Sequence, residues 1–449
     1  MRLDAHGSSL AATSDAAVAA FDHVVDGFLK YRADTPQRLA RLLHTAPDLA
    51  MAHCLRGCFA MLATRQDLLP AAIAAAAAAR ALADGASARE QAHIAALEAW
   101  TRSDLTRALA IWETILARHP HDLLALRLAH FIYFWLGRPE DMAASVARVL
   151  PQWSPDDPSY ASLLACHCFA LEECGDYAAA EPAGRQAIAR DPGDLWATHG
   201  VAHVMEMQGR REEGIAWLAA LAPNWTGGNN LQHHLWWHCA LFHLERGDHA
   251  TVLDLYDRAF RDLAAPLTVA QPDLNLDVQN AASMLFRLQR LGQPVGDRWE
   301  ELADHAEARI GDCLSAFTLP HWMMALAAAG RDQAAERMLA AMRDFAAGPG
   351  DIAPLVRDYA LPVCEAVRAH AAGRHGQAVT LMRPAVSGMH RLGGSHAQQD
   401  VLQQLFVASA LAADLPADVA LILSRRRHLP PEQQAGWRGA ARHRAGAHR

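Results

Sequence analysis

The chain has 449 residues, of which 52% are hydrophobic, and its formal net charge at pH 7 is −8. Alanine and leucine dominate the apolar residues, and alternating runs of β-branched residues are missing, so the composition favours an all-α fold and excludes a protein built on sheets. The charge is spread along the chain without a basic face, so we expect no nucleic-acid partner.

In chain order, the spacing of apolar residues and the Gly, Asp and Pro breakers predict a long series of helices. The first helices are expected over 16–29, 36–43, 49–64, 70–83, 89–101, 105–118, 122–136, 141–150, 160–173, 178–190, 195–208 and 212–221. A loop rich in Gly and Asn follows at 224–230. Later helices are expected over 277–291, 298–308, 316–329, 332–345, 354–371, 376–389, 398–413 and 416–424.

A turn made of glycine and a charged residue recurs between these helices, mostly at intervals of roughly 33 to 45 residues. The turn positions are Ser103, Gly137, Gly175, Gly209, Gly247, Gly330 and Gly373. Small residues lie at fixed offsets from these turns and allow close helix crossings, for example Ala108, Ala180, Ala202, Gly214, Ala240 and Ala335. The pattern predicts a right-handed α-solenoid of tetratricopeptide-like helix pairs with a concave surface for binding.

The cysteines and the apolar segments indicate the compartment. Eight cysteines are scattered through predicted helices, and the N-terminus lacks a secretion signal. We therefore expect reduced, mostly buried thiols and a cytoplasmic protein. The alanine run at 71–79 is too short and too weakly apolar to span a bilayer, so we expect no membrane partner.

Histidine is the residue type that points to a site, because 25 histidines are about twice a typical share of ~2.5%. His199 and His203 are four apart on one predicted helix, and His234 and His238 are four apart on the next, so each pair shares a helix face. In tetratricopeptide geometry these positions turn toward the concave wall. The candidate groove residues are His199, His203, Glu206, His234, His238, Asp277, Asn280, His321 and His396.

A metal site is one interpretation of this groove. The two histidine pairs, together with Glu206, offer enough imidazole and carboxylate for zinc, since histidines at i and i+4 are a common zinc arrangement. No HExxH motif is present, and inward histidines often only hydrogen-bond each other. We therefore assign no metal and no cofactor, and keep the four histidines as weak zinc candidates.

An acid–base or hydrolytic site is the second interpretation. The histidines would act as general bases, oriented by Asp277, Glu206 or Asp400. The candidate nucleophiles are Ser283, Ser395 and Cys364. No GxSxG motif or phosphate-binding loop supports a named reaction, so the sequence leaves enzyme status open.

A binding groove is the leading interpretation. Trp196, Trp236, Trp237 and Trp322 would add flat apolar surface to the histidines, although core packing is the commoner role of tryptophans at helical spacing. The expected partner is a peptide segment of another protein or a small polar metabolite. Trp225, on the Gly- and Asn-rich loop, either seals a neighbouring helix pair or forms a lid over the groove.

Four stretches together carry a resemblance to a known family: HGVAHVMEMQGR at 199–210, HLWWH at 234–238, LFHLERGD at 241–248, and GGSHAQ at 393–398 followed by Asp400. They resemble the tetratricopeptide repeat protein 38 family over nearly the whole chain. The resemblance implies an all-helical superhelix and an intracellular protein, and it implies no particular reaction. It marks His199, His203, Glu206, His234 and His238 as a candidate site. Gln399 departs from it, because related sequences tend to carry Arg there.

The expected domain organisation follows the repeats. N-terminal helices occupy 1–48, tetratricopeptide-like repeats 49–390, capping helices 391–424, and a basic, flexible tail 425–449. Ser395 and Gln398 have capping-box spacing at the start of the last long helix, where His396 would contribute to the groove.

Overall fold

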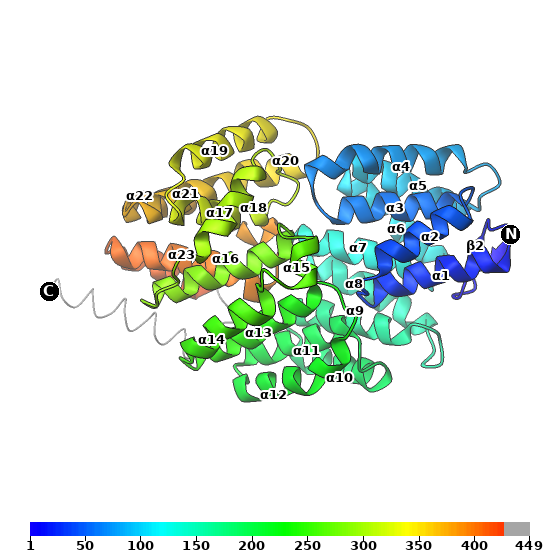
Figure 1. Ribbon diagram of the computed structural model, residues 1–449, viewed down its shortest axis with the longest axis horizontal. Coiled ribbons are helices and arrows are strands. Elements are labelled where there is room, and N and C mark those ends of the chain that lie inside the picture. The colour runs from blue at the N-terminus through cyan, green and yellow to red at the C-terminus, as the bar shows by residue number, and fades with distance from the viewer. Residues whose placement is uncertain (426–449) are drawn as a thin grey trace. The chain divides into compact units, whose positions relative to one another are not determined.

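The computed structural model describes residues 1–425, which fold almost entirely into helices (Figure 1). The predicted basic tail at 425–449 lies outside the described residues, except that Arg425 ends the last helix. The chain divides into two compact units. The first comprises Met1–Val204 and Ala216–Leu235, and the second comprises Met205–Ile215 and the chain from Trp236 onward.

The first unit begins with a small hairpin and continues as helices. Strand β1 (Arg2–Leu3) pairs antiparallel with β2 (Ser9–Leu10), a feature too short for sequence alternation to reveal. The helices are α1 (Asp15–Leu29), α2 (Thr35–Thr45), α3 (Ala50–Leu62), α4 (Leu69–Ala81), α5 (Ala88–Thr101), α6 (Leu105–Arg118), α7 (Leu123–Trp135), α8 (Pro139–Val149), α9 (Tyr160–Glu173) and α10 (Tyr177–Arg190). Three further helices contribute residues to both units: α11 (Leu195–Gln208), α12 (Arg211–Leu221) and α13 (Leu231–Glu245).

The second unit is also helical, and two of its segments contain π-helical turns. Its helices are α14 (His249–Leu255), α15 (Pro266–Ala270), α16 (Asn275–Arg290), α17 (Arg298–Ala308), α18 (Thr318–Ala328), α19 (Asp332–Ala346), α20 (Ile352–Leu355), α21 (Leu361–Ala371), α22 (His375–Met382), α23 (His396–Ala412) and α24 (Pro416–Arg425). A π-helical turn at Val356–Ala360 separates α20 from α21, where the sequence predicted one helix. Helix α22 ends before Pro384, earlier than predicted, because proline cannot continue a helix.

Successive helices pack against each other as pairs, and the pairs stack. Within the first unit α3 packs on α4, α5 on α6 and α9 on α10, and within the second α21 packs on α22 (Figure 1). Contacts of α3 with α5 and of α7 with α9 join one pair to the next. The predicted all-α solenoid of tetratricopeptide-like helix pairs is confirmed. No helix among residues 1–425 combines the length and apolar character needed to cross a bilayer.

The repeat signals have a direct structural basis. Each predicted turn position, from Ser103 to Gly373, has a positive φ, a conformation that glycine adopts without steric cost. The small residues at fixed offsets are buried at helix crossings, with Ala108, Ala180, Ala202 and Ala240 fully enclosed. The sequence pattern therefore marked both the ends of the helices and their points of closest approach.

Gly214 provides a test of this close packing. A Cβ atom added there would lie 2.3 Å from Cζ of Phe242, whose ring is fully buried on α13. We expect Gly214→Ala to destabilise the protein by about 1–3 kcal/mol in urea unfolding, because overpacking outweighs the gain in helix propensity. Enlarging the exposed Ala219 of the same helix to leucine is the control and should change stability by about 0.5 kcal/mol or less. An unchanged Gly214→Ala variant would contradict this account.

Candidate histidine site

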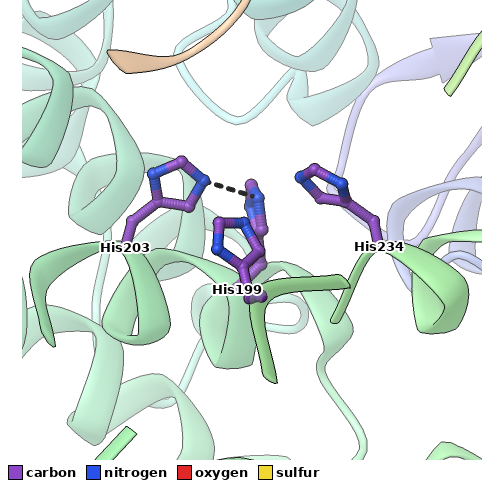
Figure 2. Close-up of side chains that lie close together, drawn as sticks. His199, His203 and His234 are labelled. Atoms are coloured by element: carbon purple, nitrogen blue, oxygen red, sulfur yellow. Dashed lines mark hydrogen bonds between the residues drawn. The ribbon is translucent and has the colours of Figure 1, made fainter. Parts of the chain in front are cut away.

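Three of the predicted histidines meet in the first unit. His199 and His203 lie one turn apart on α11, and His234 lies near the start of α13 (Figure 2). The Nε2 atoms of His199 and His203 are 2.9 Å apart, and the ring centroids of His199 and His234 are 4.9 Å apart. The predicted convergence of these three side chains is therefore present. We call His199, His203 and His234 the histidine cluster.

The histidine cluster is enclosed by protein. The exposed fractions of His199, His203 and His234 are 3%, 0% and 2%. The ring of Phe169 on α9 stacks on that of His199 with centroids 5.2 Å apart, and the ring centroid of Trp196 lies 4.7 Å from that of His199. The histidines were expected to face the concave wall, and in the structure they are buried among aromatic rings. This enclosure favours a small ligand over an extended peptide as the occupant of the cluster.

A glycine explains how α11 comes close enough to α9. Gly200 follows His199, and a Cβ atom at this position would lie 2.8 Å from Sγ of Cys168 on α9. The missing side chain lets the two helices approach, which brings Phe169 and Glu172 of α9 against the histidines. The i, i+4 spacing orients the histidines, and the glycine supplies the contact with the neighbouring helix.

Glu172 is a site residue that the sequence analysis missed. Its Oε2 lies 3.5 Å from Nδ1 of His203, and both side chains are fully buried. Nε2 of the same ring faces the cluster. A carboxyl group near the other ring nitrogen is common in histidines that bind a metal. Adjacent carboxylates at Glu172 and Glu173, in an otherwise apolar helix, were the available signal.

The histidine cluster has the composition of a metal site. One ring nitrogen from each of His199, His203 and His234 lies within 4.8 Å of the others. Zinc binds imidazole nitrogen at about 2.0–2.1 Å, so small side-chain adjustments would bring three ligands around one ion. Three histidines with an orienting carboxylate leave a fourth position of a tetrahedral ion for water or another small ligand.

Glu206 and His238 belong to the second unit, where both are held in uncharged forms at neutral pH. Burial lowers the pKa of His238 to about 3, with a further contribution from Arg287. Burial raises the pKa of Glu206 to about 8, with Asp400 adding to the shift while Arg287 and Arg211 oppose it. The two side chains lie 4.0 Å apart. Glu206 was predicted to orient a histidine as a carboxylate, and a pKa of about 8 instead favours its protonated form at pH 7.

The remaining predicted groove residues also belong to the second unit. Asp277 and Asn280 are fully buried on α16. Nδ1 of His321 on α18 lies 2.9 Å from the carbonyl oxygen of Phe317, and burial lowers its pKa to about 4. His396 is the first residue of α23 and is partly buried. A neutral, backbone-bonded histidine such as His321 has a structural role.

The candidate nucleophiles lack activation. Burial raises the pKa of Cys364 well above its ordinary value, so this thiol does not ionise at neutral pH. The Ser283 hydroxyl donates to the carbonyl oxygen of Asn280 at 3.0 Å. The Ser395 hydroxyl accepts from the backbone N–H of Gln398 at 3.2 Å in the predicted capping box. These contacts give both serine hydroxyls a local structural partner.

Two other local predictions are resolved by the structure. Trp225 is buried within the first unit rather than exposed on a lid. Gln399 donates from Nε2 to the carbonyl oxygens of Gly393 and Gly394, at 3.1 and 2.9 Å, so it binds the loop without an ion pair. Asp400 pairs instead with Arg287 at 3.3 Å.

Comparisons with known proteins place the chain at the level of its fold. No protein-family model matches the sequence. The human IFIT1 dimer with m7Gppp-AAAA matches with a TM-score of 0.43 and 13% identity, over 97% of this chain and 96% of that chain. The IFIT1 dimer with PPP-AAAA matches with a TM-score of 0.43 and 12% identity, over 97% and 94%. The Naa15/Naa10 structure bound to HypK-THB matches with a TM-score of 0.27 and 14% identity, over 92% and 68%.

This chain is a tetratricopeptide-like helical repeat protein. Membership of the tetratricopeptide repeat protein 38 family stays a prediction. The expectation of no nucleic-acid partner is contradicted by the matched IFIT1 structures, which contain m7Gppp-AAAA and PPP-AAAA, and we withdraw it. The ligands named in the matches are those of IFIT1.

Proposed function

We propose that this repeat protein binds a small polar ligand at the histidine cluster, and that a divalent transition-metal ion such as zinc is the ligand its chemistry fits best. The observation that carries the proposal is the convergence of three buried imidazoles, with ring nitrogens within 4.8 Å of one another. Neutral imidazole is a preferred ligand of zinc, copper, iron and nickel. The helical repeats would then act as a rigid frame that holds ligands from α11 and α13.

Glu172 supports metal binding over a purely structural histidine contact. A purely structural histidine pair requires only one hydrogen bond between the rings, such as the one between the Nε2 atoms of His199 and His203. The buried carboxyl group of Glu172 lies beside Nδ1 of His203, which is the place of the outer group that orients a metal-binding histidine. The alternative function is metal-dependent hydrolysis, in which the ion activates water in its fourth position.

A peptide or protein partner is the other ligand class suggested by the repeats. It would bind an accessible face of the helices, whereas the histidine cluster is buried. We also propose a cytoplasmic location, supported by the free thiols of all eight cysteines, which lie within residues 1–425.

Elemental analysis and zinc titration of the chelator-treated protein test the metal proposal. We expect about one zinc ion per chain, and loss of binding in His203→Asn, because that substitution removes one of three ligands. Glu172→Gln should weaken zinc affinity by roughly 10- to 100-fold while leaving the ligands in place.

His321→Asn is the matched control, since His321 is an equally buried histidine that bonds a backbone carbonyl. It should bind zinc as the unmodified protein does. A protein that contains no metal and takes up no added zinc would overturn the proposal, as would equal losses in the His203 and His321 variants.

A further inference from the structure

Arg127 of α7 is a buried cation without a carboxylate partner. Its exposed fraction is 1%, and a guanidinium stays charged at any physiological pH. Two hydrogen bonds of Arg127 run from Nη1 to Sγ of Cys166 at 3.1 Å and from Nη2 to the carbonyl oxygen of Leu29 at 3.4 Å. Within residues 1–425 no ion pair forms on Arg127, whereas the buried Arg261 binds Glu301 through two nitrogens. A buried charge of this kind is costly unless an anion compensates it.

Aromatic rings surround the guanidinium. Its Cζ atom lies 5.0 Å from the centre of the Tyr31 ring, 4.9 Å from that of Trp196 and 5.4 Å from that of Phe131. Tyr31 and Trp196 stack on each other with centroids 5.6 Å apart. These cation–π contacts hold the guanidinium in place, but they supply no negative charge and no hydrogen-bond acceptor.

Several buried polar atoms at and around Arg127 have no hydrogen-bond partner. Nε of Arg127, the hydroxyl of Tyr31 and Nε1 of Trp196 are buried and make no hydrogen bond to the protein. Both ring nitrogens of the buried His130, whose ring lies 6.0 Å from that of Trp196, are likewise unbonded. Native interiors leave few polar atoms unsatisfied, so this concentration of donors calls for an acceptor group.

We propose that Arg127, Tyr31 and Trp196 form a binding site for a small organic carboxylate. A guanidinium presents its N–H groups in a fork that matches a carboxylate, and an indole N–H and a phenol would add two further donors. Asp194, which caps α11 through the Ala197 amide at 2.9 Å, already contributes negative charge near Arg127. A bound monoanion would therefore meet less repulsion from Asp194 than a phosphate dianion. This inference is independent of the metal proposal, although Trp196 contacts both Arg127 and His199.

Acetate and propionate are the probes for this site. We expect saturable stabilisation by either salt in thermal unfolding, beyond that of chloride or phosphate at equal ionic strength. Tyr31→Phe, which removes only the hydroxyl, should weaken acetate binding by roughly tenfold, and Arg127→Met should abolish it. The indole N–H resonance of Trp196, assigned by its loss in Trp196→Phe, should shift on acetate addition.

Arg261→Met provides the control, since Arg261 is buried to the same degree but already paired with Glu301. It should bind acetate normally. Equal effects of acetate and chloride, or undiminished acetate binding in both the Tyr31 and Arg127 variants, would overturn the proposal. Zinc binding by the Arg127→Met protein should persist, so failure at this site is distinguishable from failure at the histidine cluster.

Discussion

Replacing Asp122 by alanine is expected to destabilise the protein by about 3–5 kcal/mol, because it breaks a buried ion-pair network. Oδ2 of Asp122 accepts from Nη1 of Arg89 at 3.0 Å and from Nε2 of His93 at 2.9 Å. Oδ1 accepts from the Ala125 amide at 2.9 Å and so caps α7. Asp122 and Arg89 are both buried, so the substitution leaves the Arg89 charge with Asp4 as its remaining ion-pair partner.

Urea unfolding measures this effect, with Asp141→Ala as the control. Asp141 pairs with Arg138 at an exposed position, where the loss should be about 1 kcal/mol or less. A loss of the same small size for Asp122→Ala would show that the buried network contributes no net stability.

The pH dependence gives a second readout for Asp122. Burial opposes its ionisation, but His93 and Arg89 overcome this and hold the pKa of Asp122 well below its ordinary value. Because the pKa of Asp122 is lower in the folded protein than in the unfolded chain, its ionised form stabilises the fold at pH values above about 4, the pKa in the unfolded chain. This stabilisation is lost as the pH falls below about 4. The stability difference between the unmodified protein and Asp122→Ala should therefore shrink below about pH 4.

Glu206→Gln is expected to stabilise the protein at pH 8, in contrast to the destabilising Asp122→Ala. Burial raises the pKa of Glu206 to about 8, and its side chain is 11% exposed. Between about pH 4.5 and pH 8 the Glu206 carboxyl group keeps its proton in the folded protein and releases it in the unfolded chain. The free energy of unfolding therefore falls as the pH rises through this range. A neutral glutamine escapes this penalty, and the gain should reach ~2–4 kcal/mol at pH 8 while staying near zero at pH 4.5.

Unfolding at several pH values between 4.5 and 8 tests the Glu206 prediction. The difference between the variant and the unmodified protein is the relevant quantity, because Glu245, whose pKa burial and Glu206 raise to about 7, titrates in the same range. Glu140→Gln, at an exposed position, should give a flat difference curve. Parallel curves for Glu206→Gln and the unmodified protein would rule out a buried neutral carboxyl at this position.

Local patterns identified most of the helices because each depends on neighbours in the sequence. The bounds of α6, α9, α11 and α17 agree with the prediction at both ends. The segments around the π-helical turns were harder to predict. The wider i→i+5 turn moves the following apolar residues away from the 3.6-residue spacing by which a helix is recognised in sequence. The N-terminal hairpin was missed because two-residue strands carry no detectable alternation.

The candidate site was predictable only in part. The i, i+4 spacing placed His199 and His203 on one face, which is a property of a single helix. Their burial and their contact with Glu172 depend on the approach of α9 and α11, which Gly200 permits. Glu206 was a reasonable ligand in sequence, but its desolvation in the fold protonates it at neutral pH.

The sequence by itself determined the helical pairs, the positive-φ turns between them and the helix face that carries each histidine, because these features are set within about one turn or one repeat. Only the tertiary structure decided which side chains share a space. The donors around Arg127 come from the turn after α1, from α7 and from α11, segments far apart in the chain. Packing between helices brings these side chains together and sets their charge states through burial. The spacing of apolar residues within one helix does not predict such contacts.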